Sequence, residues 1–157
     1  GERRNGLEIA IENVEHDFNV GTIVRSANNF NVGIVHIIGR KKYNRRGAMC
    51  TDKYLEIKYW TDFESFVVDQ RARGREIVAI ENNTERAKPI HQKIFSKNTT
   101  LIFGSEGNGI SAELTAAADD VRFIESFGST RSLNVGVAAG VAMYEWVRQV
   151  VLSLEDN

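Results

Sequence analysis

The chain has few of the residues that mark specialised classes of protein. Its 157 residues include one cysteine, Cys50, and one proline, Pro89. A single cysteine excludes an internal disulfide framework and suits a reducing compartment, so we expect a cytoplasmic protein. The net charge is −1, so any binding of nucleic acid must come from a local patch. The start lacks the pattern of a secretion signal, and because it is Gly1 rather than methionine we expect residues upstream.

Neither a metal site nor a membrane span is indicated. The three histidines do not have the spacing of metal ligands, and one of them, His36, lies in an apolar segment. The most apolar long stretch, residues 133–152, contains polar and charged side chains such as Glu145 and Arg148. A stretch of this kind is not typical of a membrane-spanning helix.

The apolar pattern predicts one α/β domain over residues 1–157. Apolar residues make up 42% of the chain and charged residues 26%, as in ordinary soluble domains. Strands are predicted at 7–11, 33–38, 54–60, 76–80, 99–103 and 121–124. Helices are predicted at 20–30, 62–73 (capped by Asp62 or Thr61), 111–118 and 133–152. Apolar strands that alternate with helices predict a parallel sheet covered on both faces.

Three loops with unusual sequences follow predicted strands. They are residues 81–83, 104–109 and 125–132. Ligands of open parallel sheets bind beyond the carboxyl ends of the strands. We therefore expect these loops to form one binding site.

The glycine-rich loop, Gly104 to Gly109, allows several interpretations. Its spacing is that of a Walker loop, but Ile110 stands where the phosphate-binding lysine is required. Residues 107–112 fit a dinucleotide fingerprint, with Glu125 downstream, yet the loop comes too late in the chain for a Rossmann unit. A plain strand-to-helix turn explains the glycines but not Glu106 between them.

Three segments together resemble the motifs of SpoU/TrmH-type RNA ribose 2′-O-methyltransferases of the SPOUT superfamily. The first has Asn19, Gly21 and Arg25, and the second is residues 101–110. The third is Ile124 followed by Gly128 and then residues 131–135. The likeness covers about Leu7 to Trp146. One departure is Glu125, where the family usually has proline.

This resemblance implies a three-layer α/β/α sandwich with a parallel sheet and a C-terminal trefoil knot. It also implies S-adenosylmethionine as cofactor and a homodimer formed through the first-motif and C-terminal helices. The small residues after Asn134 agree with close helix packing, although packing onto the chain's own sheet explains them equally. The cofactor-binding residues implied are Ile80, Glu81, Gly104, Glu106, Gly107, Ile124, Ser132 and Leu133.

The resemblance implies catalytic roles for five polar residues. They are Arg25, Asn19, Glu106, Ser132 and Asn134. Arg25 is usually described as the base in this family, but a guanidinium only donates hydrogen bonds, so stabilising the alkoxide is the easier role to defend. Asn19 would orient Arg25 or a phosphate, and Glu106 would fix Arg25 or an amide. In the alternative interpretation Asn19 and Ser132 are helix caps and Arg25 is a surface residue.

A basic loop predicts contact with tRNA or rRNA. Five cations and a tyrosine lie between Arg40 and Arg46, after a strand's carboxyl end. Phosphate contact with base stacking is the functional interpretation, and a solvated surface loop is the alternative. The predicted RNA-binding residues are Arg40, Lys41, Lys42, Arg45 and Arg46. A non-catalytic RNA-binding module that has kept the fold is the second functional class, but the complete set of polar site residues argues against it.

Overall fold

Helices and strands alternate along the chain, as the apolar pattern predicts. The computed structural model describes residues 6–12, 17–39, 55–82, 84–105, 109–127 and 134–153, with backbone alone at 17–19. The strands are β1 (Glu8–Glu12), β2 (Ile34–Ile38), β3 (Glu56–Trp60), β4 (Glu76–Ile80), β5 (Lys88–Pro89), β6 (Thr99–Phe103) and β7 (Asp120–Phe123). The helices are α1 (Asp17–Asn29), α2 (Phe63–Ala72), α3 (Ala112–Ala117) and α4 (Val135–Val147), which continues into a π-helical turn, η2 (Arg148–Leu152).

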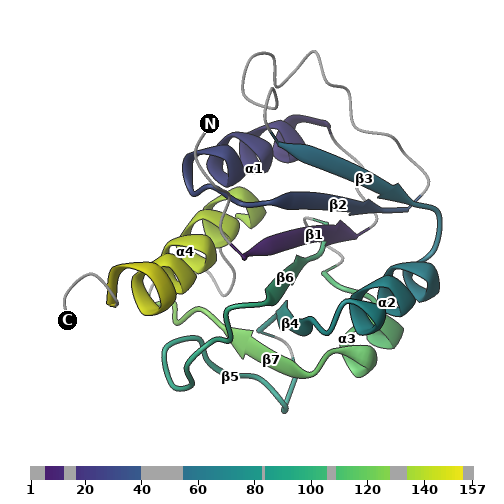
Figure 1. Cartoon of the computed structure of the whole chain (residues 1–157). Coiled ribbons are helices and arrows are strands. Elements are labelled where there is room, and N and C mark those ends of the chain that lie inside the picture. Colours follow the sequence, from purple (N-terminus) through teal and green to yellow (C-terminus); the bar gives the residue numbers. More distant parts are fainter. Residues whose placement is uncertain are drawn as a thin grey trace.

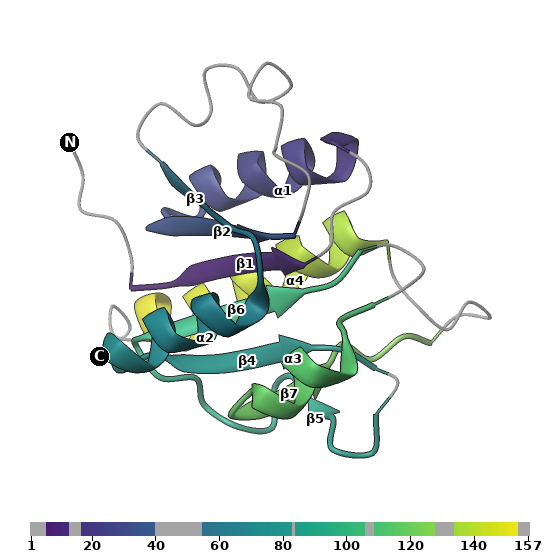
Figure 2. The same ribbon diagram turned by 90° about the vertical axis from the view of Figure 1, so that its right-hand side faces the viewer.

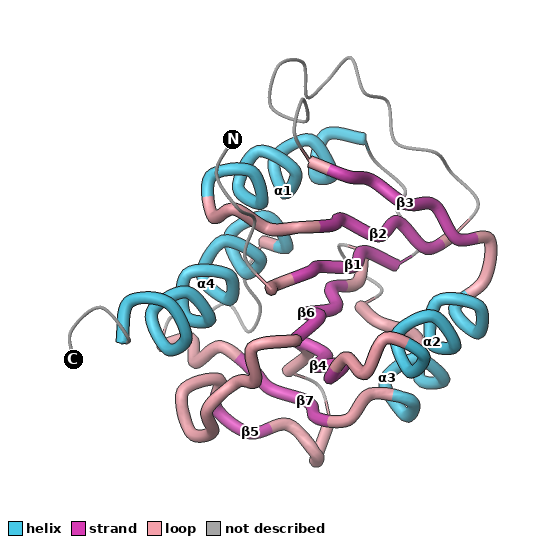
Figure 3. The backbone as a smooth tube through the Cα atoms, viewed as in Figure 1, coloured by secondary structure: helices cyan, strands magenta, loops and turns pink. Residues whose placement is uncertain are grey.

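The described strands form one parallel sheet in the order β3-β2-β1-β6-β4-β7-β5. The prediction of a parallel α/β sheet is therefore confirmed. Strand β5 was not predicted: it is two residues long and lies at the edge of the sheet beside β7 (Figure 3). Proline is tolerated there because an edge strand need not donate from every backbone amide.

Helices cover both faces of the sheet. Helices α1 and α4 lie on one face, and α2 and α3 on the other (Figures 1 and 2). Side chains of a strand alternate between faces, so successive residues enter different layers. In β1, Ile9 and Ile11 join the core beneath α1 and α4, whereas Ala10 joins the core beneath α2. The structure thus has the three layers that the sequence predicts.

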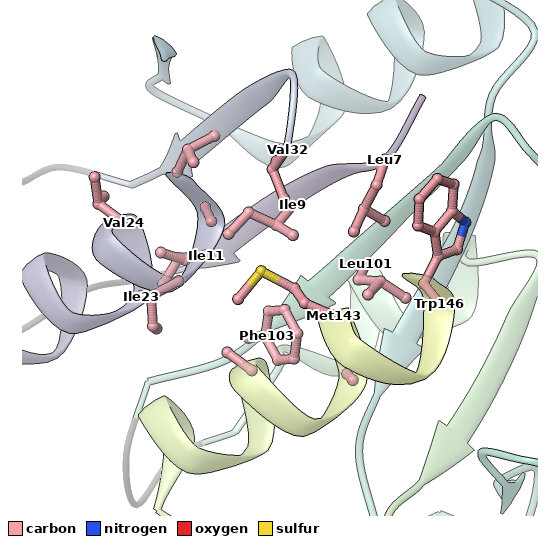
Figure 4. Close-up of a cluster of buried hydrophobic side chains, with 14 of the residues drawn as sticks. Leu7, Ile9, Ile11, Ile23, Val24, Val32, Leu101, Phe103, Met143 and Trp146 are labelled. Atoms are coloured by element: carbon pink, nitrogen blue, oxygen red, sulfur yellow. The ribbon is translucent and has the colours of Figure 1, made fainter. Parts of the chain in front are cut away.

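The larger core joins the first and last helices to the sheet. Ile23 of α1, Met143 and Trp146 of α4, and Leu101 and Phe103 of β6 are essentially inaccessible to solvent (Figure 4). Segments more than a hundred residues apart are therefore packed together. The first sequence motif lies on α1, and the last two residues of the third, Asn134 and Val135, begin α4.

A network of charged side chains ties the sheet together at the amino end of β1. Buried Glu8 accepts two hydrogen bonds of 2.7 Å from the guanidinium of Arg73 and one of 2.7 Å from His36 Nε2. Trp60 Nε1 donates to His36 Nδ1 over 2.9 Å, which leaves the imidazole proton on Nε2, facing Glu8. Arg75 adds a second guanidinium 3.4 Å from Glu8. Paired in this way, the carboxylate can be buried while charged.

One helical stretch of the described residues, Val135–Leu152, is long and apolar enough to cross a membrane by length and composition. The core helix of a soluble protein passes the same test, so this is weak evidence. Ala139, Ala142, Met143 and Trp146 of this stretch are buried in the core under the sheet.

Candidate cofactor and RNA site

The three predicted binding loops follow three adjacent strands. Ile80 ends β4, Gly104 follows β6, and Ile124 follows β7. The order of these strands is β6-β4-β7, and all run in the same direction. Their carboxyl ends therefore share one edge of the sheet, and the described residues of the loops lie side by side there. Ile80 and Ile124 are half-buried and supply apolar surface at this edge.

The described ends of the glycine-rich loop lie against each other. The amide of Gly109 donates to the carbonyl of Ser105 over 3.0 Å, and the two residues form an isolated antiparallel bridge. A Cβ on Gly104 would overlap the backbone of Gly109 and Ile110. Gly109 has φ +68, a conformation that favours glycine. Both glycines are thus required by the backbone, and the loop closes immediately beyond β6.

Glu12, Ser105 and Ser111 at this edge were not predicted as site residues, whereas Glu81 was predicted to bind the cofactor. Glu12, the last residue of β1, accepts hydrogen bonds from the amide and hydroxyl of Ser111, both 2.7 Å. Glu81 Oε2 accepts from the amide of Ile110 over 3.0 Å. The buried Oγ of Ser105 has no hydrogen-bond partner among the described residues. The only signal for Glu12 in the sequence is an acidic residue at the end of an apolar strand, because its partner lies 99 residues away.

The first and third motifs meet where α1 packs against α4. Arg25 is exposed, and its Nη2 donates to Thr22 Oγ1 over 3.4 Å. The methyl group of Thr22 lies 3.4 Å from where a Cβ on Gly136 would be. Asn134 adjoins the same glycine, since its Oδ1 accepts from the amide of Gly136 over 2.8 Å. Arg25 and Asn134 are thereby brought to one region of the helix pair, through Thr22 and Gly136.

The last helix begins two residues later than predicted. Its cap is Asn134, which also accepts from the amide of Val137 over 3.3 Å. The alternative interpretation placed the cap at Ser132. Asn134 therefore has a structural role, and its predicted catalytic role has to be compatible with the orientation that capping imposes.

Glu125, which stands in place of the family's usual proline, faces a histidine. Its carboxylate oxygen lies 3.5 Å from His91 Nδ1, and both side chains are largely exposed. Nearby on α4, the hydrogen bond from Arg148 holds the pKa of Glu145 below its usual range. Among the described residues, no group of three or more His, Cys, Asp or Glu side chains could hold a metal ion.

Several predicted site residues lie outside the part of the chain that the structure describes, or are described there by backbone alone. Asn19 is placed in α1 by its backbone. The others are Glu106, Gly107, Ser132, Leu133, Arg40, Lys41, Lys42, Arg45 and Arg46. Their roles stay predictions.

Comparison with known proteins identifies the family. The model of the SpoU rRNA Methylase family matches residues 6–144, and the chain belongs to this family. A tRNA (guanosine(18)-2'-O)-methyltransferase from Aquifex aeolicus (strain VF5) is 30% identical over 153 residues, 94% of this chain and 71% of that protein. The enzyme of the same name from Escherichia coli (strain K12) is 27% identical over 150 residues, again 94% of this chain.

The chain spans 65% of the length of that Escherichia coli relative. Among solved structures, the A. aeolicus TrmH/SpoU tRNA modifying enzyme matches with a TM-score of 0.83 and 28% identity, over 94% of this chain and 76% of that one. The resemblance seen in the sequence is confirmed. Family membership also sets aside the Walker and dinucleotide interpretations of the glycine-rich loop.

Proposed function

We propose that the protein transfers a methyl group from S-adenosylmethionine to a ribose 2′-hydroxyl of tRNA or rRNA. The observation that carries this proposal is the meeting of three motif loops at the ends of β6, β4 and β7. Family membership supports the same activity, and the matched A. aeolicus and E. coli relatives are named as tRNA ribose methyltransferases.

The described residues fit a cofactor of this kind. Gly104 has no room for a side chain, so the ligand would meet backbone groups there. Ile80 and Ile124, at the ends of the next two strands, offer apolar contacts. The hydroxyl of Ser105, unpartnered among the described residues, can bond a polar group of the ligand. When bound, S-adenosylmethionine supplies the methyl group and the leaving group. The protein supplies position, orientation and electrostatic stabilisation.

Arg25 would act on the substrate rather than on the cofactor. Its exposed guanidinium carries only hydrogen-bond donors, arranged in a planar fork that matches a phosphate. It can pair with an RNA phosphate and stabilise the negative charge that develops on the 2′-oxygen. Thr22 orients it from the preceding turn of α1. Asn134 lies beside the same part of α1, through Gly136 and Thr22, and would add a second polar side chain next to the substrate.

The RNA would approach along the edge that carries these loops. The basic loop 40–46 follows β2, whose carboxyl end faces the same way as those of β4, β6 and β7. Phosphate contacts by its cations position an RNA without reading its sequence. A cytoplasmic location agrees with such a substrate and with the single cysteine.

The C-terminal trefoil knot is also part of the proposal. Strand β7 lies beyond β4, yet α4, which follows it, packs near β6 and α1. The same helix is fastened to the segment before β6: Trp146 Nε1 donates to the carbonyl of Ser96 over 3.0 Å, and Gln149 Oε1 accepts from the amide of Phe95 over 2.8 Å. These contacts between the last helix and the segment before β6 support the proposed knot.

A homodimer through α1 and α4 completes the proposal. Val137, Val141 and Tyr144 are 53%, 41% and 49% exposed and recur at helical spacing on one face of α4. Gly140 lies between them with open space around it. The ring of Phe30, just after α1, packs on that of Tyr144 with 6.3 Å between centroids. An apolar stripe with a small residue at its centre suits close approach of a second copy.

The decisive experiment is single-turnover transfer of labelled methyl from S-adenosylmethionine to total RNA. A methylated ribose lacks the 2′-hydroxyl that drives alkaline cleavage, so the label should appear in alkali-resistant dinucleotides. DNA of matched sequence, which has no 2′-hydroxyl, is the control and should stay unlabelled. A protein that binds RNA but transfers no label would be the non-catalytic module. Label on a base instead of ribose would contradict the proposed position of methylation.

A further inference from the structure

Two carboxylates hold the closed base of the glycine-rich loop from opposite sides. The base is formed by Gly104 and Ser105 at the end of β6 and by Gly109 and Ile110 on the return. The strands on either side of β6 are β1 and β4. Each of these strands has a glutamate at its carboxyl end, and each glutamate reaches the returning chain.

Glu12 holds the loop from the β1 side. It is the last residue of β1 and is 8% exposed. Its two oxygens accept from Ser111, one from the amide and one from the hydroxyl, both over 2.7 Å. The hydroxyl of Ser111 also accepts from the amide of Leu114 over 3.2 Å and so caps α3. A buried carboxylate is costly unless its oxygens are hydrogen-bonded, which makes this contact directional and strong.

Glu81 holds the loop from the β4 side. It follows the last residue of β4, and its backbone amide donates to the carbonyl of Arg122 in β7 over 2.9 Å. Its Oε2 accepts from the amide of Ile110 over 3.0 Å. The same oxygen lies 2.5 Å from where a Cβ on Gly109 would be, so a side chain at this position would displace the carboxylate from the loop.

The two contacts engage consecutive backbone amides. Ile110 is held by Glu81 and Ser111 by Glu12, so the chain leaving the loop cannot shift toward either neighbouring strand without breaking a bond to a charged acceptor. We propose that Glu12 and Glu81 are positioning residues that hold the glycine-rich loop in the shape required for cofactor binding. This inference rests on the proposed function. It gives the carboxylate of Glu81, a residue predicted to bind the cofactor, a role in holding the loop.

The test compares alanine and glutamine at both positions. Glu12→Ala and Glu81→Ala should each weaken S-adenosylmethionine binding by about tenfold, the scale of one hydrogen bond to a charged group. Glu12→Gln and Glu81→Gln should stay within about threefold of the wild type, because the amide oxygen still accepts from the loop amide. Isothermal titration of the purified protein with S-adenosylmethionine gives the affinities.

Glu8→Gln is the matched control. Both residues are buried, and they are the first and last residues of β1. Glu8 lies at the amino ends of the strands, away from the cofactor loops at their carboxyl ends. Glu8→Gln should lower thermal stability without changing cofactor affinity. If Glu8→Gln weakened cofactor binding as much as Glu12→Ala, the loss of affinity would be a general result of lower protein stability. The inference would then fail.

Amide hydrogen exchange of the cofactor-free protein is a second readout. Glu12→Ala should accelerate exchange at Ser111, and Glu81→Ala at Ile110, while the amide of Leu101 within β6 stays as protected as before. Unchanged exchange at Ile110 and Ser111 would overturn the positioning role. Faster exchange with wild-type affinity would also overturn it, because the loop would then not need to be held. A wild-type protein that binds no S-adenosylmethionine would instead overturn the proposed function.

Discussion

Gly104 and Gly109 approach each other so closely that a Cβ on Gly104 would overlap the carbonyl group of Gly109. The two residues stand at the two ends of the loop that follows β6, and the bridge between Ser105 and Gly109 closes it. Moving a side chain cannot relieve such an overlap, because the atoms that a Cβ would meet are backbone. The shape of the loop therefore depends on the absence of a single methyl group.

The first prediction is that Gly104→Ala weakens cofactor binding. The added Cβ forces the loop ends apart, so we expect affinity for S-adenosylmethionine to fall by at least about tenfold. Gly74→Ala is the control: Gly74 has φ +68 and nothing within 4 Å of the position that a Cβ would take, so alanine there costs stability, on the order of 1 kcal/mol, away from the site. Titration calorimetry and thermal unfolding of both variants separate the two effects. Equal cofactor affinities in the two variants would contradict the prediction.

A second prediction concerns acid stability. Burial alone raises the pKa of Glu8, but hydrogen bonds from Arg73 and His36 and the charge of Arg75 together lower it to about 2, from an ordinary value of 4.5. A carboxyl whose pKa is lower in the folded state stabilises the fold above its unfolded pKa. That contribution, about 3 kcal/mol, is lost as the pH falls from 4.5 toward about 2.

Urea unfolding at several pH values tests this sign. The free energy of unfolding of the wild type should fall more steeply between about pH 5 and pH 3 than that of Glu8→Gln, which cannot titrate at this position. At neutral pH Glu8→Gln should be less stable by about 3 kcal/mol, because the guanidinium groups of Arg73 and Arg75 each lose a buried anionic partner. Parallel pH profiles for the two proteins would show that Glu8 does not control acid stability.

The sheet could be predicted because its signal is local. Runs such as residues 101–103 are apolar at every position, and a strand buried on both faces needs no more than that. The same rule could not find β5, since Lys88 and Pro89 carry no apolar pattern and pair only with the edge of β7. The start of α4 was missed by two residues because Ser132 and Asn134 are both good caps, and only the fold decides between them.

The site was predictable as far as its residues belong to sequence motifs. Gly104, Ile80 and Ile124 lie at the ends of strands that the apolar pattern finds, and the parallel direction brings these ends together. Glu12 and Ser111 belong to no motif, and their contact spans 99 residues. Contacts of this kind follow from strand order, which places β1 beside β6, and strand order cannot be read from apolar periodicity.

The third prediction tests the proposed dimer. Val141→Glu places a charge in the middle of the apolar stripe of α4 and should shift the protein to monomers. Val68→Glu is the matched control, because Val68 on α2 is 68% exposed and lies on the other face of the sheet. Sedimentation equilibrium of the three proteins at one concentration measures the change. A wild type that is monomeric, or a Val141→Glu variant that still dimerises, would contradict the proposal.

The fourth prediction concerns the basic loop. Replacing Arg45 and Arg46 with alanine should weaken RNA binding and reduce the slope of log affinity against log salt by up to about one unit per lost phosphate contact. Cofactor affinity should be unchanged. The control replaces Lys58 and Lys97, two cations outside this loop, with alanine. Filter binding over a range of salt concentrations gives both slopes. Equal slopes in the two double variants would show that the loop has no special role in RNA binding.

The last prediction separates chemistry from cofactor binding at Arg25. Arg25→Ala should lower single-turnover methyl transfer by about a hundredfold or more, the scale observed when one donor to a developing oxyanion is lost. Arg25→Lys should restore little, because an ammonium cannot make the planar, two-pronged contact of a guanidinium with phosphate. Cofactor affinity should stay within about twofold in both variants, since Arg25 lies on α1 and the cofactor loops follow β4, β6 and β7. Thr22→Val removes the hydroxyl that accepts the hydrogen bond from Arg25 Nη2. This variant should also lower methyl transfer, but by less than Arg25→Ala. Near-normal methyl transfer by Arg25→Ala would show that Arg25 has no part in the mechanism and is an ordinary surface residue of α1.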